Sequence, residues 1–322
     1  MFWLAPFQSV YNITLQPLAP FTWFGLSLST LDIIATFRLC LVLRQVRELQ
    51  WNAHVAQHGS KAKREPRSFA KDAFNTLLVV YGGEAAMGPW LGITPSFMIS
   101  GTVPILYILA QAIVEYMPEV PSMSFETELP LAIVDGFTRS FLLCTLVPPT
   151  VTQNASALIS TSPWALLLSS LLTNSGFFMI NTLSALSPGN FALTTPTELQ
   201  PYGWATTDLW CAPAITGLYA FLTHAQPFWA DLHVVESGEK GPLGMVLQPV
   251  MTPEEARSFC AAILATMFTT RAVKNFRPEL LPTRWRPVRQ VEGESLSILV
   301  VLVLPILTVF VLCLGGEKEK TQ

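Results

Sequence analysis

Charged residues are scarce in this chain of 322 residues, where Asp, Glu, Lys and Arg together make up 13%. Soluble globular domains carry about 25%, because charged side chains cover the surface that faces water. Hydrophobic residues make up 51% of the chain, and the mean hydropathy is +0.43. This balance excludes a disordered chain and predicts that most of the surface does not face water. The net charge of −3 carries no signature of nucleic-acid binding, so we expect no nucleic-acid partner.

Cysteine pairs are also lacking. The five cysteines are far apart in the sequence, form no Cys-x-x-Cys pair and lie in apolar runs, at Cys40, Cys144, Cys211, Cys260 and Cys313. A free cysteine in such a run behaves as a small hydrophobic residue. We therefore expect neither a disulfide framework nor a metal site.

Catalytic motifs are missing as well. The chain has no Gly-x-Ser-x-Gly, His-Glu-x-x-His or P-loop sequence. Its four histidines fall outside the apolar runs below, with His54 and His58 in one segment and His224 and His233 in another. These absences argue against an enzyme, and we expect no catalytic residue and no cofactor.

Long apolar runs are what the sequence does contain. A transmembrane helix needs about 20 mostly apolar residues. Seven runs fit: 21–43, 69–87, 97–117, 129–147, 163–186, 253–276 and 296–314. The sixth opens with Thr252, Pro253 and Glu255, which combine a capping box with proline at the first helical position. The sequence therefore predicts an all-α integral membrane protein with seven transmembrane helices.

The basic residues set the expected orientation of these helices. Residues 1–20 contain no Lys or Arg, whereas the polar segment 44–68 is rich in both. Loops rich in Lys and Arg stay on the cytosolic side of a membrane. We therefore expect a lumenal N-terminal tail and a water-exposed cytosolic loop after the first helix.

Two parts of the chain share a pattern. The runs within 21–117 form one set of three helices, and those within 129–276 form a second set with an insertion at 187–251. In each set the first helix carries an acid followed by an arginine, and the second carries small residues that can break it. These residues are Asp32, Arg38, Gly82 and Gly83 in the first set, and Asp135, Arg139, Ser175 and Gly176 in the second. Three helices per set reverse the orientation, so we predict an inverted repeat with a functional site at the helix breaks.

Charged side chains inside the apolar runs form the candidate site. A charge at the middle of a bilayer costs at least ~2.5 kcal/mol, so it rarely faces lipid. Asp135 and Arg139 lie four residues apart on one helical face and are expected to pair, whereas Asp32 and Arg38 are expected to find partners on other helices. Such groups line an ion path or a lipid-headgroup site, or serve as structural ion pairs. Glu84 is expected near the lumenal end of its helix.

The small residues at the breaks have two interpretations. Gly82-Gly83 and Ser175-Gly176 either kink helices that line a cavity or let two helices approach closely. Their matching positions in the two sets favour the kink.

Several stretches, in their order and spacing, carry a resemblance to a known family. They are the basic segment 64–68, the run 74–92 around Gly82-Gly83, the residues from Asp135 to Arg139, the run 163–183 around Asn174-Ser175-Gly176, and the run 258–271. Together they resemble the trimeric intracellular cation (TRIC) channel family, with its basic loop, its two glycine-broken helices and its sixth helix. In place of that family's Lys-Glu-Val motif, this chain has Asp135 and the residues after it.

The resemblance implies a protomer of three, three inverted and one helices, and a homotrimer with a pore through each protomer. It also implies conduction of K⁺ or other monovalent cations across the endoplasmic reticulum or nuclear membrane, as counter-ion current for Ca²⁺ release and uptake. In that family, a Lys and an Arg of the fourth helix contact phosphoinositide lipid. Arg139 matches this arginine, but Asp135 stands where the family has lysine, which puts phosphoinositide binding in doubt here.

The insertion 187–251 departs from the family and contains the apolar stretch 205–223. If that stretch spans the membrane, there are eight helices, the C-terminus is lumenal and the basic loop 277–295 is cytosolic. If it does not, there are seven, and the polar tail 315–322, which ends in a Lys-x-Lys-x-x retrieval pattern, is cytosolic. Asp208, Pro213 and Gly217 favour seven helices, with the insertion at the cytosolic interface or re-entering the membrane.

Two other functions stay open from the residues alone. A secondary transporter would place a small-molecule or ion site at the same helix breaks. A structural membrane protein would share the fold without conducting. The reversed charge at Asp135 keeps this function open, because it is compatible with lost conduction.

Overall fold

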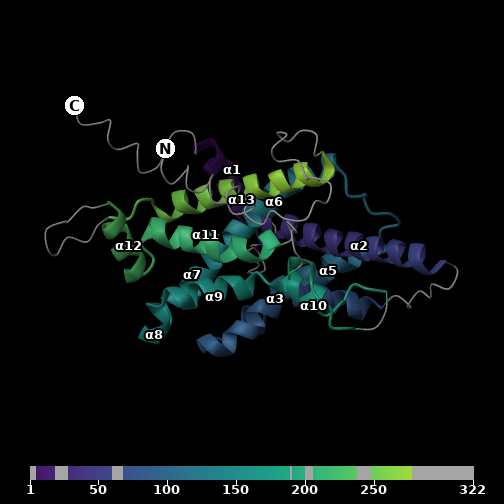
Figure 1. Cartoon of the computed structure of the whole chain (residues 1–322), viewed down its shortest axis with the longest axis horizontal. Helices are drawn as coiled ribbons and strands as arrows, with labels where there is room; N and C mark the ends of the chain where they lie inside the picture. Colours follow the sequence, from purple (N-terminus) through teal and green to yellow (C-terminus); the bar gives the residue numbers. More distant parts are fainter. Residues whose placement is uncertain are drawn as a thin grey trace, which may run out of the picture. The chain divides into compact units, whose positions relative to one another are not determined.

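The computed structural model of the chain describes residues 5–18, 28–59, 68–188, 191–199, 206–237 and 248–277. The chain divides into two compact units, 1–280 and 281–322, and all described residues lie in the first. Within the described ranges the regular structure is helical apart from one isolated β-bridge, between Pro17 and Ser29 (Figure 1). The predicted all-helical class is confirmed. The predicted helix 296–314, the tail 315–322 and nearly all of the basic loop 277–295 lie outside the described residues.

The helices follow one another along the chain, and several are short or joined end to end. They are α1 (Ala5–Leu15), α2 (Thr30–His58), α3 (Phe69–Leu91), α4 (Ser96–Ile99), α5 (Thr102–Tyr116), α6 (Phe125–Phe141), the π-helical turn η3 (Leu142–Leu146), α7 (Val147–Thr152), α8 (Ala157–Ser160), α9 (Pro163–Thr173), α10 (Gly176–Thr182), the 3₁₀ turn η4 (Thr197–Leu199), α11 (Thr207–Thr223), α12 (Pro227–Ser237) and α13 (Pro253–Phe276).

Local side-chain caps fix where the long helices begin. The predicted capping box of Thr252 and Glu255 is present at the start of α13. A second capping box joins Ser29 and Asp32 at the start of α2, where the Asp32 carboxylate accepts hydrogen bonds from the Ser29 amide at 2.8 Å and hydroxyl at 2.7 Å. Asp32 was expected to pair with another helix. Its cap is the closer partner, because three residues separate the two groups on one helical turn.

The helix α2 corrects the predicted loop 44–68, because it stays helical to His58. Arg44, which was expected to face water, is 3% exposed, and its guanidinium donates to the carbonyls of Val114 and Met117 at the end of α5. Arg47 binds Glu115 of α5 at 2.8 Å and Asp72 of α3 at 2.5 Å. The water-exposed loop was wrongly predicted because basic residues were taken to face water. Here their guanidinium groups bind neighbouring helices instead, and Arg44 satisfies the unpaired carbonyls of a helix C-terminus.

The first helices of the two predicted sets, α2 and α6, pack side by side in opposite directions. Leu31 near the start of α2 shares an apolar cluster with Phe137 near the end of α6. Arg38, further along α2, binds Glu128 near the start of α6. Opposite directions are what an inverted repeat requires of its corresponding helices.

The third helix of the first set, α5, runs in the same direction as α2. Cys40 lies against the carbonyl of Tyr107, and Arg44, one turn later on α2, reaches Val114, two turns later on α5. The third helix of the second set should therefore run in the same direction as α6.

The helix that runs with α6 is α11, within the predicted insertion 187–251. Arg139 of α6 binds Asp208 at the start of α11, and Leu143 in η3 accepts a hydrogen bond from Thr216 further along α11 at 3.1 Å. α11 is buried against α9, η3 and α13, and carries much of the apolar core. The expectation that the insertion 187–251 lies at the cytosolic interface or re-enters the membrane stays a prediction, but its helix α11 is part of the apolar core.

The helix α13, predicted as the third helix of the second set, runs against α6 instead. Gly136 packs on the backbone of Ala265, and Ser140, one turn later on α6, donates to the carbonyl of Arg257, two turns earlier on α13. α13 packs along α6 and also contacts α11 and α1.

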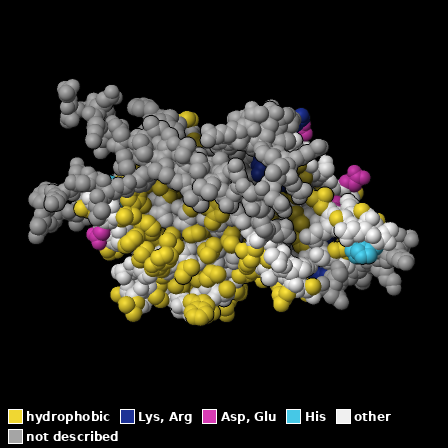
Figure 2. All heavy atoms as spheres, viewed as in Figure 1, with side chains coloured by type: hydrophobic (Ala, Val, Ile, Leu, Met, Phe, Trp, Pro, Cys, Tyr) yellow, Lys and Arg dark blue, Asp and Glu magenta, His cyan; other side chains and the backbone are white. Residues whose placement is uncertain are grey.

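Apolar side chains form exposed stripes on the outside of the bundle. On α5, Ile105, Leu109 and Ile113 are each more than half exposed at intervals of one turn, and Trp164 and Leu168 are so on α9. On the face drawn in Figure 2, hydrophobic side chains gather where Figure 1, in the same view, shows α8, α9 and α3. A helix in water turns its polar face outward, so these stripes suit an apolar solvent.

Few of the described helices pass a strict test for crossing a membrane. The continuous segment Phe125–Thr152, formed by α6, η3 and α7, is long and apolar enough. α9 and α10 pass together only if they are counted as one broken span. α2 carries several charged side chains, and α5 and α11 have 15 and 17 residues, so the predicted count of seven spans is not confirmed. An apolar helix consistent with a membrane is present.

Candidate functional site

A shared ion pair joins α2 to α6. The Arg38 guanidinium binds both carboxylate oxygens of Glu128, at 3.2 and 2.7 Å, and both oxygens of Asp135, at 3.4 and 3.2 Å. The Arg38 side chain is 9% exposed, and one base here faces two acids. This group of three, the Arg38 cluster, therefore carries a formal charge of about −1.

The opposite arrangement lies further along α6. Arg139 binds the Asp208 carboxylate at 3.2 Å, and Arg271 of α13 binds the other oxygen of the same carboxylate at 2.5 Å. Both guanidinium groups also lie over the ring of Phe268, at 5.5 and 5.0 Å from its centroid. This group, the Asp208 cluster, has two bases and one acid and a formal charge of about +1.

The Asp208 cluster is anchored to the break between α9 and α10. Asn174, the first residue after α9 and part of the break, accepts a hydrogen bond from Arg139 at 2.8 Å and donates to the backbone carbonyl of Asp208. α9 and α10 are bent by 56° at this point. The predicted break at Asn174-Ser175-Gly176 is thus present, and it brings together α6, α9, α11 and α13.

The predicted pair of Asp135 with Arg139 does not form. Although the two lie one turn apart on α6, Asp135 binds Arg38 and Arg139 binds Asp208. A pair spaced i,i+4 contributes only about 0.2–0.5 kcal/mol. A buried guanidinium has five N–H donors to satisfy, and neighbouring helices offer more acceptors than the next turn does. The expectation that Arg38 binds another helix is confirmed.

The glycines act mainly by close packing. A Cβ on Gly83 would overlap the backbone of Leu172 and Thr173, and a Cβ on Gly176 would overlap the backbone of Val79. α3 and the broken pair α9–α10 therefore cross in opposite directions at two reciprocal glycine contacts. Small residues at a helix crossing allow this backbone approach.

The second helix of the first set has no break. α3 continues without interruption through Gly82 and Gly83 to Leu91. A Cβ on Gly82 would meet only the end of the flexible Met179 side chain and Leu78. The predicted kink at Gly82-Gly83 is therefore corrected: α3 keeps its helical hydrogen bonds, and Gly83 is the residue that lets the neighbouring backbone approach.

Glu84 lies apart from both ion clusters. Its carboxylate accepts hydrogen bonds from the Ser96 amide at 2.6 Å and the Ser96 hydroxyl at 2.8 Å. It therefore ties α3 to the short helix α4, a structural role near the end of α3.

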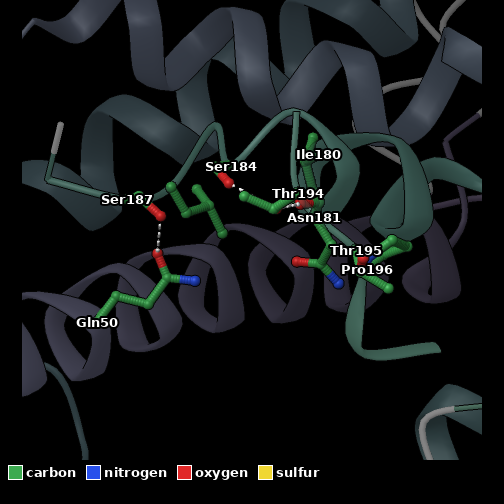
Figure 3. Close-up of a pocket in the computed structure, with 9 residues that line it drawn as sticks. Gln50, Ile180, Asn181, Ser184, Ser187, Thr194, Thr195 and Pro196 are labelled. Carbon is green, nitrogen blue, oxygen red and sulfur yellow. Dashed lines mark hydrogen bonds between the residues drawn. The ribbon is translucent and has the colours of Figure 1, made fainter. Parts of the chain in front are cut away.

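A small polar cavity of about 140 Å³ lies beside the end of α10. Its lining is hydroxyl and amide groups with three apolar residues, and contains no charged side chain: Gln50, Ile180, Asn181, Ser184, Leu186, Ser187, Thr194, Thr195 and Pro196. Figure 3 shows Gln50 reaching from α2 to Ser187, and Ser184 beside Thr194, whose hydroxyls are 2.8 Å apart. Ser184 has a positive φ of 49°, which is unusual for serine. This cavity was not predicted, although Ser and Thr recur between positions 184 and 197.

Residues missed by the sequence analysis complete both clusters. Glu128, Asp208 and Arg271 were not predicted as site residues, yet each is a charge inside or beside an apolar run. That same signal was used for Arg38 and Arg139 and would have found them. Among the described residues, no group of three or more His, Cys, Asp or Glu side chains is placed to hold a metal ion.

Comparisons of the chain with protein-family models, with curated proteins and with solved structures found no match in any of the three. The two ion clusters and the helix break are therefore the features from which a function can be inferred.

Proposed function

We propose that this protein is a multi-pass integral membrane protein that conducts monovalent cations, K⁺ in particular, along a path beside the α9–α10 break. The observation that carries the proposal is the Asp208 cluster, in which charged side chains from three helices meet at a bent, apolar helix pair. Ionisable groups at such positions in a membrane mark ion or substrate paths.

The helix directions support an inverted repeat with revised membership. Its first half is α2, α3 and α5, and its second half is α6, α9–α10 and α11, since α11 runs with α6 as α5 runs with α2. α13 is then an additional helix, and the apolar run 296–314 is the eighth span. This assignment puts the basic loop 277–295 on the same side as the basic segment 60–67, as the positive-inside rule prefers.

The balance of charge supports a path for ions rather than a bundle held only by apolar contacts. The Arg38 cluster and the Asp208 cluster have opposite formal charges and lie within about one helical turn of each other along α6. Together they are neutral, so neither cation nor anion meets a large net charge. The C-terminus of α9, which carries a partial negative charge, faces this region and favours cations.

The resemblance to trimeric intracellular cation channels supports the remaining parts of the proposal. These are a homotrimer, the endoplasmic reticulum or nuclear membrane as its location, and a role as counter-ion path for Ca²⁺ movement. Phosphoinositide binding at Arg139 is disfavoured, because Asn174 and Asp208 already occupy its guanidinium.

A secondary transporter is the second candidate. The observation that favours it is the hydroxyl-lined cavity at the end of α10, which has room for a few water molecules or a small polar solute. Transporters place their substrate sites beside broken helices.

Planar-bilayer recording of the purified, reconstituted protein in asymmetric KCl tests the proposal. We expect unitary currents that reverse towards the K⁺ equilibrium potential, and a changed unitary conductance in Arg139→Gln. The control is Asp231→Asn, at an exposed acid on α12, which should leave the currents unchanged. Silent bilayers from correctly assembled protein would reject the channel and leave solute uptake into vesicles to separate a transporter from a non-conducting structural protein.

A further inference from the structure

Asp208 is the residue on which the polar contacts around the break converge. Its carboxylate binds Arg139 of α6 and Arg271 of α13, and its backbone carbonyl accepts hydrogen bonds from Asn174 and Arg139. It lies in the first turn of α11, within the predicted insertion 187–251.

The cluster is not sealed inside the bundle. The side chains of Arg139, Asp208 and Arg271 are 21%, 25% and 25% exposed. In the neighbouring cluster Arg38 and Glu128 are 9% and 12% exposed, and Asp135 is 25% exposed. A path beside the break would therefore have access to the Asp208 cluster and to Asp135, whereas Arg38 is covered by its acids.

The net charge of the Asp208 cluster depends on the carboxylate of Asp208. With Asp208 ionised, the cluster carries about +1, which the −1 of the Arg38 cluster offsets. Without Asp208, two adjacent guanidinium groups stand unneutralised, and arginine does not deprotonate in proteins. Such a pair repels a passing cation and attracts an anion.

We infer that Asp208 sets the charge selectivity of the path, by neutralising one of the two arginines that would otherwise exclude cations. This inference rests on the proposed channel function. Asp208 makes the path permeable to cations, and Arg271 opposes it. Asp135 has a weaker effect, because its removal leaves Arg38 still held by both oxygens of Glu128.

The test is the K⁺ to Cl⁻ permeability ratio, measured from reversal potentials in asymmetric KCl with assembled protein. We expect Asp208→Asn to lower the ratio by at least about tenfold, and more than Asp135→Asn does. Arg271→Gln should raise it, and the double variant Asp208→Asn with Arg271→Gln should restore the original ratio because the formal charge is then unchanged. Asp231→Asn, at an exposed acid on α12, is the matched control.

Opposite signs from Asp208→Asn and Arg271→Gln separate selectivity from stability, since a purely structural role lowers function in both. If Asp208→Asn fails to assemble, Arg271→Gln and the double variant still decide the matter. A conducting wild type with an unchanged ratio in Asp208→Asn, or a double variant that does not restore the ratio, would overturn the inference alone. A silent wild type would overturn the proposed channel function and the inference with it.

Discussion

At the scale of single residues, the interior is organised by shared ions. Arg38 holds two acids, and Asp208 holds two bases. A charge removed from water needs several hydrogen-bond partners, so one group shared between two partners is better satisfied than one in a simple pair. Truncating the shared member leaves its partners unpaired, which is the costly case.

The Arg38 cluster predicts a stability effect. Arg38→Gln leaves Glu128 and Asp135 close together without a positive charge, so we expect a loss of about 3 kcal/mol or more in the free energy of unfolding. Thermal unfolding in detergent measures it, with Asp231→Asn, at an exposed acid on α12, as the control. An unchanged transition temperature would mean that the two acids are neutralised by another route.

At the scale of helices, packing between elements determines which helices form the core. α11 contains Asp208, Pro213 and Gly217, which make it a poor span by composition, yet it lies in the core between α9 and α13. Asp208 is neutralised there, and Gly217 faces Leu167 and the Trp229 ring, where there is no room for a larger side chain without a shift. Asp208 and Gly217, which argued against a transmembrane span, are therefore contacts that hold α11 in the core.

The crossing of α3 with α9–α10 predicts a sharp dependence on glycine. A methyl group at Gly83 or Gly176 would overlap backbone atoms, which cannot move as a side-chain end can. Gly83→Ala and Gly176→Ala should each destabilise the fold by about 3 kcal/mol or more, or prevent assembly. The matched control is Gly101→Ala, whose new methyl group would make only ordinary contact with Ile105. Size-exclusion profiles and thermal unfolding of the three variants would decide, and a stable Gly176→Ala would show that the crossing tolerates separation.

At the scale of the whole molecule, the number of spans depends on whether α11 crosses the membrane. If α11 and α13 both cross the membrane, the chain has eight spans and its two ends lie on the same, lumenal side. The Lys-x-Lys-x-x pattern at the C-terminus is then out of reach of a cytosolic retrieval receptor.

Labelling of introduced cysteines tests this topology. In sealed microsomes, a membrane-impermeant maleimide should label Ser60→Cys and Arg284→Cys but not Thr321→Cys until the membrane is permeabilised. The four described native cysteines are buried and free, so their background is expected to be low. Labelling of Thr321→Cys in intact microsomes would restore the seven-span topology.

Sequence alone determined the features that depend on neighbouring residues. The helical class, the cap at Thr252, the break at Asn174-Ser175-Gly176 and the burial of the four described cysteines in apolar surroundings were predicted correctly. Each follows from a few adjacent positions, because helix propensity, capping and apolar burial are local properties. The need of Arg38 for a distant partner also followed, since its charge lies within an apolar run.

Only the tertiary structure decided which partners meet. Asp135 binds Arg38, 97 positions away, and Arg139 binds Asp208, 69 positions away, although spacing alone favoured pairing them with each other. The extension of α2 through its basic residues and the core position of α11 were missed for the same reason. Sequence spacing tells which side chains share a face of one helix, whereas the direction and proximity of other helices decide which charges are close enough to neutralise each other.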